Sequence, residues 1–169
     1  MRIYKWNANL QIANINNANM DDKLIYKDLS YKINGILFAV HNELGRFKNE
    51  KQYSDKIEEY LKKLKVVYER EKTLPSSIKQ EIIGKDRVDF IVDNKIVLEV
   101  KAKSFLNKED YYQVRRYLSI INRKLGILVN FRAKYIVPKR ILNSKASEWL
   151  FAIRIIRILF VYLHYDNSY

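Results

Sequence analysis

The stretch Val88–Lys103, VDFIVDNKIVLEVKAK, decides the fold of this chain. Apolar and polar residues alternate over Val88–Val92 and again over Ile96–Ala102, which predicts two short strands. The polar tripeptide DNK at 93–95 separates the two runs and has the composition of a turn. The sequence therefore predicts a β-hairpin, and the length of its tip determines which side chains share a face.

A three-residue tip at Asp93–Lys95 pairs Phe90 with Leu98 and Asp89 with Glu99. A two-residue tip would instead pair Asp89 with Leu98 and mix the apolar and polar sets. Only the three-residue tip gives one wholly apolar face, and a slip by one residue would destroy that face. We therefore expect Asp89 and Glu99 to lie opposite each other, with Cβ atoms about 5 Å apart.

Two carboxylates at this separation repel each other unless one is protonated or a cation lies between them. Lys101 lies two residues beyond Glu99 and shares its face. The pattern therefore favours a divalent metal site on this face. The alternative is a solvent-facing surface of the sheet, but Ile91 and Val97 fall on the same face and indicate that it is partly covered.

The remaining chain has the pattern of an α/β domain with helices before, between and after strands. Helical spacing of apolar residues predicts helices over Lys23–Leu44 and Asn49–Leu64, and Asn107 is a candidate N-cap for a helix ending near Arg123. Further strands are expected over Val66–Arg70, Lys79–Ile83 and Leu125–Phe131, with a short strand in KYIVPKRI (134–141) stopped by Pro138.

Glu50 is a third candidate acid, on the second predicted helix. At 100° per residue it falls within the apolar stripe of that helix, whereas Glu59 points away. An acidic side chain on a buried stripe is costly unless it has a task, so Glu50 strengthens the case for a metal site. The alternative is a first-turn glutamate that interacts with the helix dipole.

The composition limits the chemistry of any site. The 169 residues include 32 Lys and Arg against 19 Asp and Glu, a net charge of +13 that favours a polyanionic partner such as nucleic acid. The alternative is a basic protein whose charge has no such role. With no cysteine and only two histidines, a metal would need oxygen ligands, which points to Mg²⁺ or Mn²⁺. The N-terminus lacks the apolar core of a signal peptide, so a cytoplasmic location is expected.

Three segments are expected along the chain: a loosely ordered leader over 1–22, a domain over 23–143 and an apolar extension over 144–169. The extension contains WLFAIRIIRILFVYLHY (149–165), which is shorter than an uncharged membrane span and includes two arginines. It is expected to form a helix or strand that packs on the domain, without stable membrane insertion. It is also a candidate surface for a homo-oligomer or a protein partner.

Several motifs, in order, resemble one known family. Asp89 followed by EVK (99–101) resembles the D-x(n)-[DE]-x-K core of the PD-(D/E)XK nuclease superfamily. The motifs VHNELGRF (40–47), EKQY (50–53), RVDFIVDNKIVLEVKA (87–102), QVRRY (113–117) and LGILVNF (125–131) together resemble the bacterial GxxExxY family within it. Phe47 stands where that pattern has glycine, and Val88 stands where the superfamily often has proline.

The resemblance implies a restriction-endonuclease-like α/β core, with a central mixed sheet flanked by helices, that hydrolyses phosphodiester bonds using Mg²⁺ or Mn²⁺. By the same resemblance Asp89 and Glu99 would bind the metal, with Glu50 in support, and Lys101 would assist the attacking water and the developing charge. The residues expected to bind nucleic acid or support the site are Gln113, Tyr117, Arg87, Lys103 and Arg116.

The substrate would be nucleic acid, with DNA preferred to RNA as the expected partner. For Gln113 and Tyr117 the alternative is a hydrogen bond along the edge of a helix, and the basic surface around Arg116 could simply be solvated. Two other functions stay open. The same fold could be an inactive module that binds nucleic acid or a protein, or it could be an oligomeric scaffold.

Overall fold

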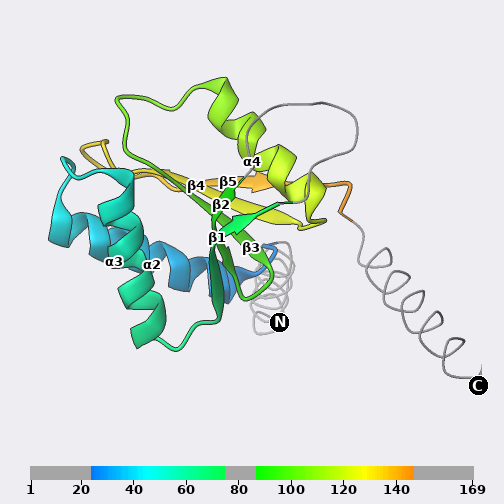
Figure 1. Cartoon of the computed structure of the whole chain (residues 1–169), viewed down its shortest axis with the longest axis horizontal. Coiled ribbons are helices and arrows are strands. Elements are labelled where there is room, and N and C mark those ends of the chain that lie inside the picture. The colour runs from blue at the N-terminus through cyan, green and yellow to red at the C-terminus, as the bar shows by residue number, and fades with distance from the viewer. Residues whose placement is uncertain (1–23, 75–86, 147–169) are drawn as a thin grey trace, which may run out of the picture.

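The computed structural model describes residues 24–74 and 87–146. These residues form three helices and five strands (Figure 1). In chain order they are α2 (Lys27–Leu44), α3 (Glu50–Lys63), β1 (Tyr68–Thr73), β2 (Arg87–Val92), β3 (Ile96–Lys101), α4 (Lys108–Ile120), β4 (Leu125–Asn130) and β5 (Lys139–Leu142). The expected leader, the expected strand at Lys79–Ile83 and the apolar segment 149–165 lie outside the described residues.

The five strands form one mixed sheet in the order β1-β2-β3-β4-β5. Strands β3 and β4 are parallel, and the other neighbouring pairs are antiparallel. A parallel pair requires a crossover connection, and α4 supplies it between β3 and β4. The expected α/β fold with a central mixed sheet is confirmed, and β3 is its central strand.

The β2–β3 hairpin has the predicted register. Its ladder pairs Phe90 with Leu98 and Val92 with Ile96, which leaves a tip of three residues. The first two tip residues, Asp93 and Asn94, have φ of 51° and 52°. Asp and Asn tolerate this left-handed conformation better than other non-glycine residues. The hydrophobic pattern and the turn residues therefore favour the same register.

Helices cover both faces of the sheet (Figure 1). Helices α2 and α3 pack their apolar stripes on one face, where the sheet contributes Phe90, Val92, Ile96, Leu98 and Val100 among others. Helix α4 packs on the opposite face, against a smaller cluster that includes Val97 and Leu128. The sheet is thus buried on both sides, and any charged side chain on β3 is placed between packed layers.

Gly126 allows the close approach of α4 to β4. A Cβ atom at this position would meet Val114 Cγ1 at less than the separation two carbon atoms can adopt, and Leu118 at 3.4 Å. Because β3 and β4 are adjacent, this close packing fixes α4 above the central strands.

Three local expectations were wrong. Pro138 precedes β5 instead of stopping a strand: β5 pairs with β4 from Lys139 onward, because proline itself has no N–H to donate to the ladder. Val88 does not share a face with Phe90 and Val92 but packs in the cluster beneath α4. Glu50 is exposed at the first turn of α3 and not buried on its stripe.

Candidate functional site

The site lies where β3 ends, and its central feature is an ion pair on that strand. Glu99 is 2% exposed, and its Oε1 accepts a hydrogen bond of 2.8 Å from Lys101 Nζ. The two side chains share a face because they are two residues apart on one strand. Burial of both groups in the middle of the sheet requires such pairing, so Lys101 is positioned by Glu99.

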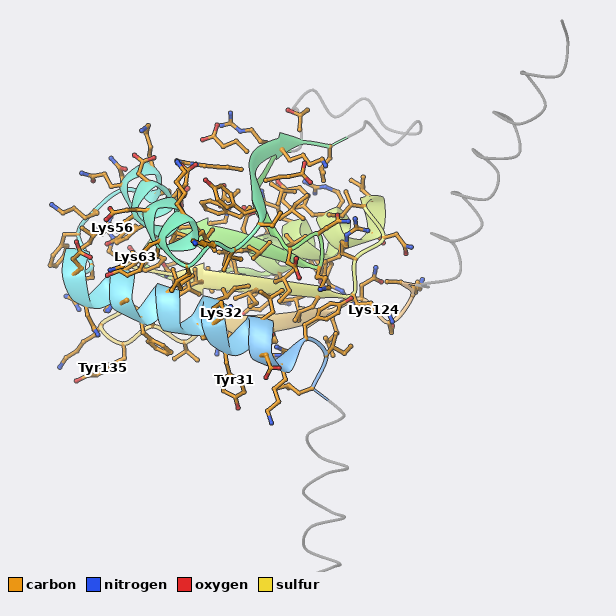
Figure 2. All side chains as sticks on the ribbon, turned by 90° about the horizontal axis from the view of Figure 1, so that it is seen from below. Tyr31, Lys32, Lys56, Lys63, Lys124 and Tyr135 are labelled. Atoms are coloured by element: carbon orange, nitrogen blue, oxygen red, sulfur yellow. The ribbon has the colours of Figure 1, made fainter. Side chains whose placement is uncertain are left out.

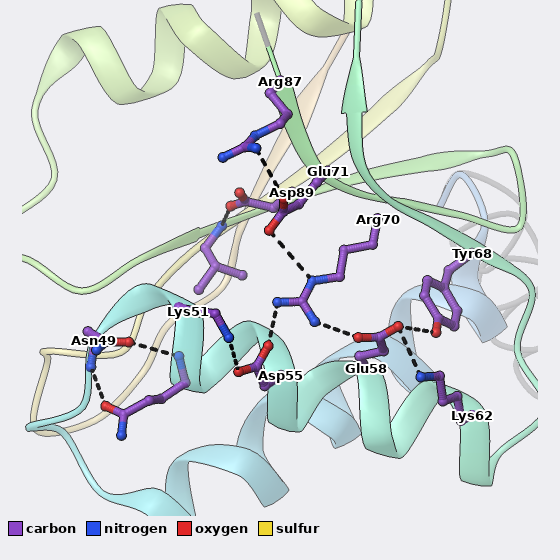
Figure 3. Close-up of polar contacts among 12 residues, drawn as sticks. Asn49, Lys51, Asp55, Glu58, Lys62, Tyr68, Arg70, Glu71, Arg87 and Asp89 are labelled. Carbon is purple, nitrogen blue, oxygen red and sulfur yellow. Dashed lines mark hydrogen bonds and ion pairs between the residues drawn. The ribbon is translucent and has the colours of Figure 1, made fainter.

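Asp89 enters the site from β2, where it interrupts the regular pairing of the sheet. Its Oδ2 accepts a hydrogen bond of 2.8 Å from the backbone N–H of Val100 (Figure 3). The β2–β3 ladder stops at Phe90–Leu98, one pair short of the expected Asp89–Glu99 pair. In β1, Glu71 has φ of 51° and interrupts the ladder on the other side. Side chains along β2 therefore stop alternating regularly between the two faces of the sheet at Asp89. This explains why Val88 packs beneath α4 and not on the face of Phe90 and Val92.

Asp89 and Glu99 are two acids whose charged forms are disfavoured, chiefly by burial. Burial, reinforced by repulsion from Asp89, raises the pKa of Glu99 from 4.5 to about 7. Burial also raises the pKa of Asp89; Glu50 adds to this, and the Val100 N–H and Lys101 oppose it. A bound cation would relieve both repulsion and desolvation.

Lys101 keeps its charge in this environment. Burial lowers its pKa, but attraction to Glu99, Asp89 and Glu50 outweighs that effect, and the net shift is upward. An ammonium group held charged next to two carboxylates can stabilise negative charge on a substrate.

Glu99 also has an unused oxygen. Its Oε2 is buried and accepts no hydrogen bond from the described residues. A buried carboxylate oxygen without a partner is costly, and a metal ligand bond is one way to satisfy it. Within residues 24–74 and 87–146, however, no three acidic or histidine side chains form a ready-made metal cluster.

Glu50 reaches the same end of β3 from the start of α3. Its Oε1 accepts a hydrogen bond of 3.0 Å from the Ala102 N–H, one residue after Lys101. The charge of Glu50 contributes to the pKa shifts of both Asp89 and Lys101. Asn49 places it there through a capping box with Gln52 (Figure 3). The structure thus brings Glu50 close to the other three residues, although not as a buried side chain.

Two of the three basic residues expected to bind nucleic acid or support the site, Arg87 and Lys103, are paired with acidic side chains. Arg87 forms an ion pair of 3.1 Å with Glu71, and its charge lowers the pKa of Asp89 (Figure 3). Lys103 Nζ lies 2.7 Å from the carboxylate of Asp110, the residue that completes the capping box of α4. Lys103 therefore fixes the start of α4 beside the site.

Gln113, Tyr117 and Arg116 form a separate group on α4. Gln113 Nε2 donates a hydrogen bond of 2.6 Å to the Tyr117 hydroxyl, and the Arg116 guanidinium lies 5.6 Å from the Tyr117 ring centroid. Tyr117 is buried against the sheet. The hydrogen bond along the edge of the helix, one of the two readings of this pair, is present.

Sequence reasoning missed two residues that shape the site. The Asn130 side chain accepts from the Lys103 N–H at 3.1 Å and donates to the Lys103 carbonyl at 2.7 Å, joining the ends of β3 and β4. Arg132 donates to the Ala102 carbonyl at 3.2 Å. The signal for Asn130 was a polar residue at the end of an otherwise apolar strand. Arg132 had no comparable signal.

Comparison with known proteins identifies the family. A family model described as the PD-(D/E)XK nuclease superfamily matches residues 27–141, which include Glu50, Asp89, Glu99 and Lys101. No curated protein and no solved structure gives a significant match. None of the helices in the described ranges has the length and apolar character needed to cross a bilayer. The chain belongs to the PD-(D/E)XK nuclease superfamily.

Proposed function

We propose that this protein is a metal-dependent nuclease that hydrolyses phosphodiester bonds of DNA or RNA, with DNA as the preferred substrate. The observation that supports this best is the unpartnered, buried Oε2 of Glu99, next to Asp89 and bonded through Oε1 to Lys101. The family suggests a nuclease, and this arrangement has the groups that such chemistry needs.

Asp89 and Glu99 would bind Mg²⁺ or Mn²⁺, with Glu50 supporting the site from α3. Mg²⁺ commonly uses one or two carboxylates and takes its remaining ligands from water and substrate phosphate, so a two-acid site fits this ion. When bound, the metal would supply Lewis-acid stabilisation of the phosphoryl oxygens. It would also offset the burial, and the repulsion from Asp89, that together raise the pKa of Glu99.

Lys101 would act on the attacking water and on the charge that develops at the phosphate. Its ammonium is held by Glu99 at 2.8 Å and stays protonated. A fixed positive charge in a partly desolvated site stabilises a developing anion more than a mobile surface lysine does. The contribution of Lys101 is therefore expected in the transition state.

The finer assignments are also proposals. The motif resemblance favours the GxxExxY family within the superfamily. We assign the nuclease-like domain to residues 23–143, with a leader over 1–22 and an extension over 144–169 that offers a surface for a partner or a second copy. A cytoplasmic location is the expectation from the sequence.

The deciding experiment is a nuclease assay on purified full-length protein. Linear, circular and single-stranded DNA and RNA are incubated with Mg²⁺, Mn²⁺ or EDTA. Cleavage should require metal and should be lost in Asp89→Asn and Glu99→Gln. The matched control is Glu59→Gln, which changes an exposed acid on α3 and should leave cleavage intact. Tight binding without cleavage of any substrate by the folded wild type would instead establish an inactive binding module.

A further inference from the structure

Phe47, in the loop between α2 and α3, has an unusual environment for an exposed aromatic ring. It is 74% exposed, which alone means little because single exposed apolar residues are common. Two guanidinium groups, however, lie near its ring: Arg46 at 5.0 Å and Arg132 at 5.9 Å from the centroid. Most of the ring surface stays open to solvent despite both cations.

The loop that holds Phe47 is anchored on either side of that residue. The Tyr53 hydroxyl donates to the Gly45 carbonyl at 2.8 Å and accepts from the Lys48 N–H at 3.1 Å. The Tyr53 ring is buried and stacks on Phe131, with centroids 4.3 Å apart. Phe131 directly precedes Arg132. The stacked pair Tyr53–Phe131 therefore holds both the loop that carries Phe47 and the segment that carries Arg132. A preorganised loop loses little conformational freedom on binding.

This group of residues adjoins the candidate site through Ala102. The Ala102 carbonyl accepts from Arg132 at 3.2 Å, and the Ala102 N–H donates to Glu50 at 3.0 Å. Ala102 follows Lys101 in the chain. A ligand on Phe47 would therefore lie next to the residues proposed to act on the phosphodiester.

We propose that Phe47, Arg46 and Arg132 bind an unpaired nucleotide of the substrate beside the cleaved bond. The base would stack on the Phe47 ring, and the phosphates on either side would contact the two guanidinium groups. Base stacking on exposed aromatic rings and positive charge along the backbone are the two means by which proteins bind single strands. Bases inside a duplex are already stacked and cannot reach the ring.

The occupant is identified by the combination of ring and charge. An apolar partner segment would gain nothing from two guanidinium groups, whereas a polyanion matches them and the net charge of +13. The proposal rests on the proposed nuclease function and specifies its substrate as single-stranded DNA or RNA, or an unpaired end.

The test is a binding measurement in which cleavage plays no part. Full-length protein in EDTA is titrated against a labelled single strand and against a hairpin duplex of the same composition, with anisotropy as the readout. Phe47→Ala should weaken single-strand binding about tenfold and change duplex binding by less than twofold. Phe47→Trp should retain binding, and Phe47→Leu should not, because leucine is apolar but cannot stack.

Two controls separate stacking from charge and from general surface effects. Tyr31→Ala removes another exposed aromatic ring, on α2 and turned outward (Figure 2), and should bind like wild type. Arg46→Gln should reduce the slope of log affinity against log salt by about 0.7, as expected for one phosphate contact on a single strand. As a direct readout of stacking, the fluorescence of a single strand that carries 2-aminopurine should be quenched on binding to wild type. This quenching should be lost in Phe47→Ala.

Equal losses on single strand and duplex, full binding by Phe47→Leu, or failure of wild type to bind single strands would each overturn the inference. Metal-dependent cleavage by wild type together with any of these results would leave the nuclease function standing and reject the role of Phe47. Selective single-strand binding through Phe47 without any cleavage would reject the nuclease function alone.

Discussion

Replacing Glu99 with Gln should make the stability of the metal-free protein less sensitive to rising pH. Glu99 is 2% exposed, and burial together with Asp89 raises its pKa from 4.5 to about 7. The folded state therefore holds the Glu99 proton more tightly than the unfolded state does. As pH rises through this window the unfolded chain loses its proton first, so stability falls and stays low above pH 7.

The size of the effect follows from the shift. Each pKa unit corresponds to about 1.4 kcal/mol, so the charged Glu99 carboxylate lowers the free energy of unfolding by about 3 kcal/mol at pH 8 relative to acidic pH. Gln keeps the size of the side chain and has no proton to lose. Because part of the effect is already present at pH 5, the difference in stability between Glu99→Gln and wild type should shift by about 2–3 kcal/mol, in favour of the variant, between pH 5 and pH 8.

Urea denaturation in EDTA at the two pH values measures this difference. Glu59→Gln is the control, because Glu59 is exposed and should follow wild type at both pH values. Millimolar Mn²⁺ at pH 8 should then stabilise wild type by binding the native state and should have no effect on Glu99→Gln. If wild type and Glu99→Gln lose equal stability between pH 5 and pH 8, burial and repulsion from Asp89 do not raise the pKa of Glu99 as described.

Three further predictions concern other parts of the molecule. Lys101→Ala should reduce cleavage by orders of magnitude while nucleic-acid affinity in EDTA falls only by about one phosphate contact, and parallel losses in both assays would contradict its role in the transition state. The hydrogen bond from Tyr68, followed by that from Arg70, lowers the pKa of Glu58 from 4.5 to about 2, so stability should decline as pH falls from 4.5 towards 2. Glu58→Gln should reduce that decline by about 1 kcal/mol in acid denaturation, and an unchanged acid profile would show that the network of Figure 3 adds little. Gly126→Ala should cost about 1–3 kcal/mol in urea denaturation because the added methyl overpacks the α4 contact, and a wild-type midpoint would disprove that packing.

The hairpin and its register could be predicted because two independent signals agreed. Only a three-residue tip separates apolar from polar side chains, and Asp93 and Asn94 accept the left-handed turn that the tip uses. The start of α4 could also be predicted from the sequence, because Asn107 and Asp110 form the capping box. In each case the decisive interactions are local in sequence.

The details around Asp89 could not be predicted, because they depend on contacts between strands. Its carboxylate replaces a backbone partner for Val100, and the opposing change occurs at Glu71 in β1. Alternation along β2 contains no sign of either event, so Val88 was assigned to the wrong face. The helical periodicity of α3 likewise cannot show that Glu50 lies in an exposed first turn.

The outermost described strands affect how this sheet behaves towards other copies of itself. An exposed strand can pair with the backbone of another molecule and start aggregation. Strand β1 has four charged residues in succession, Glu69–Lys72, and the left-handed φ of Glu71 twists it locally. Strand β5 is only four residues long, follows Pro138 and begins with two basic residues. Both features disfavour edge-to-edge pairing through these two described strands, so the strongly apolar interior of the sheet does not by itself make its edges a route to self-association.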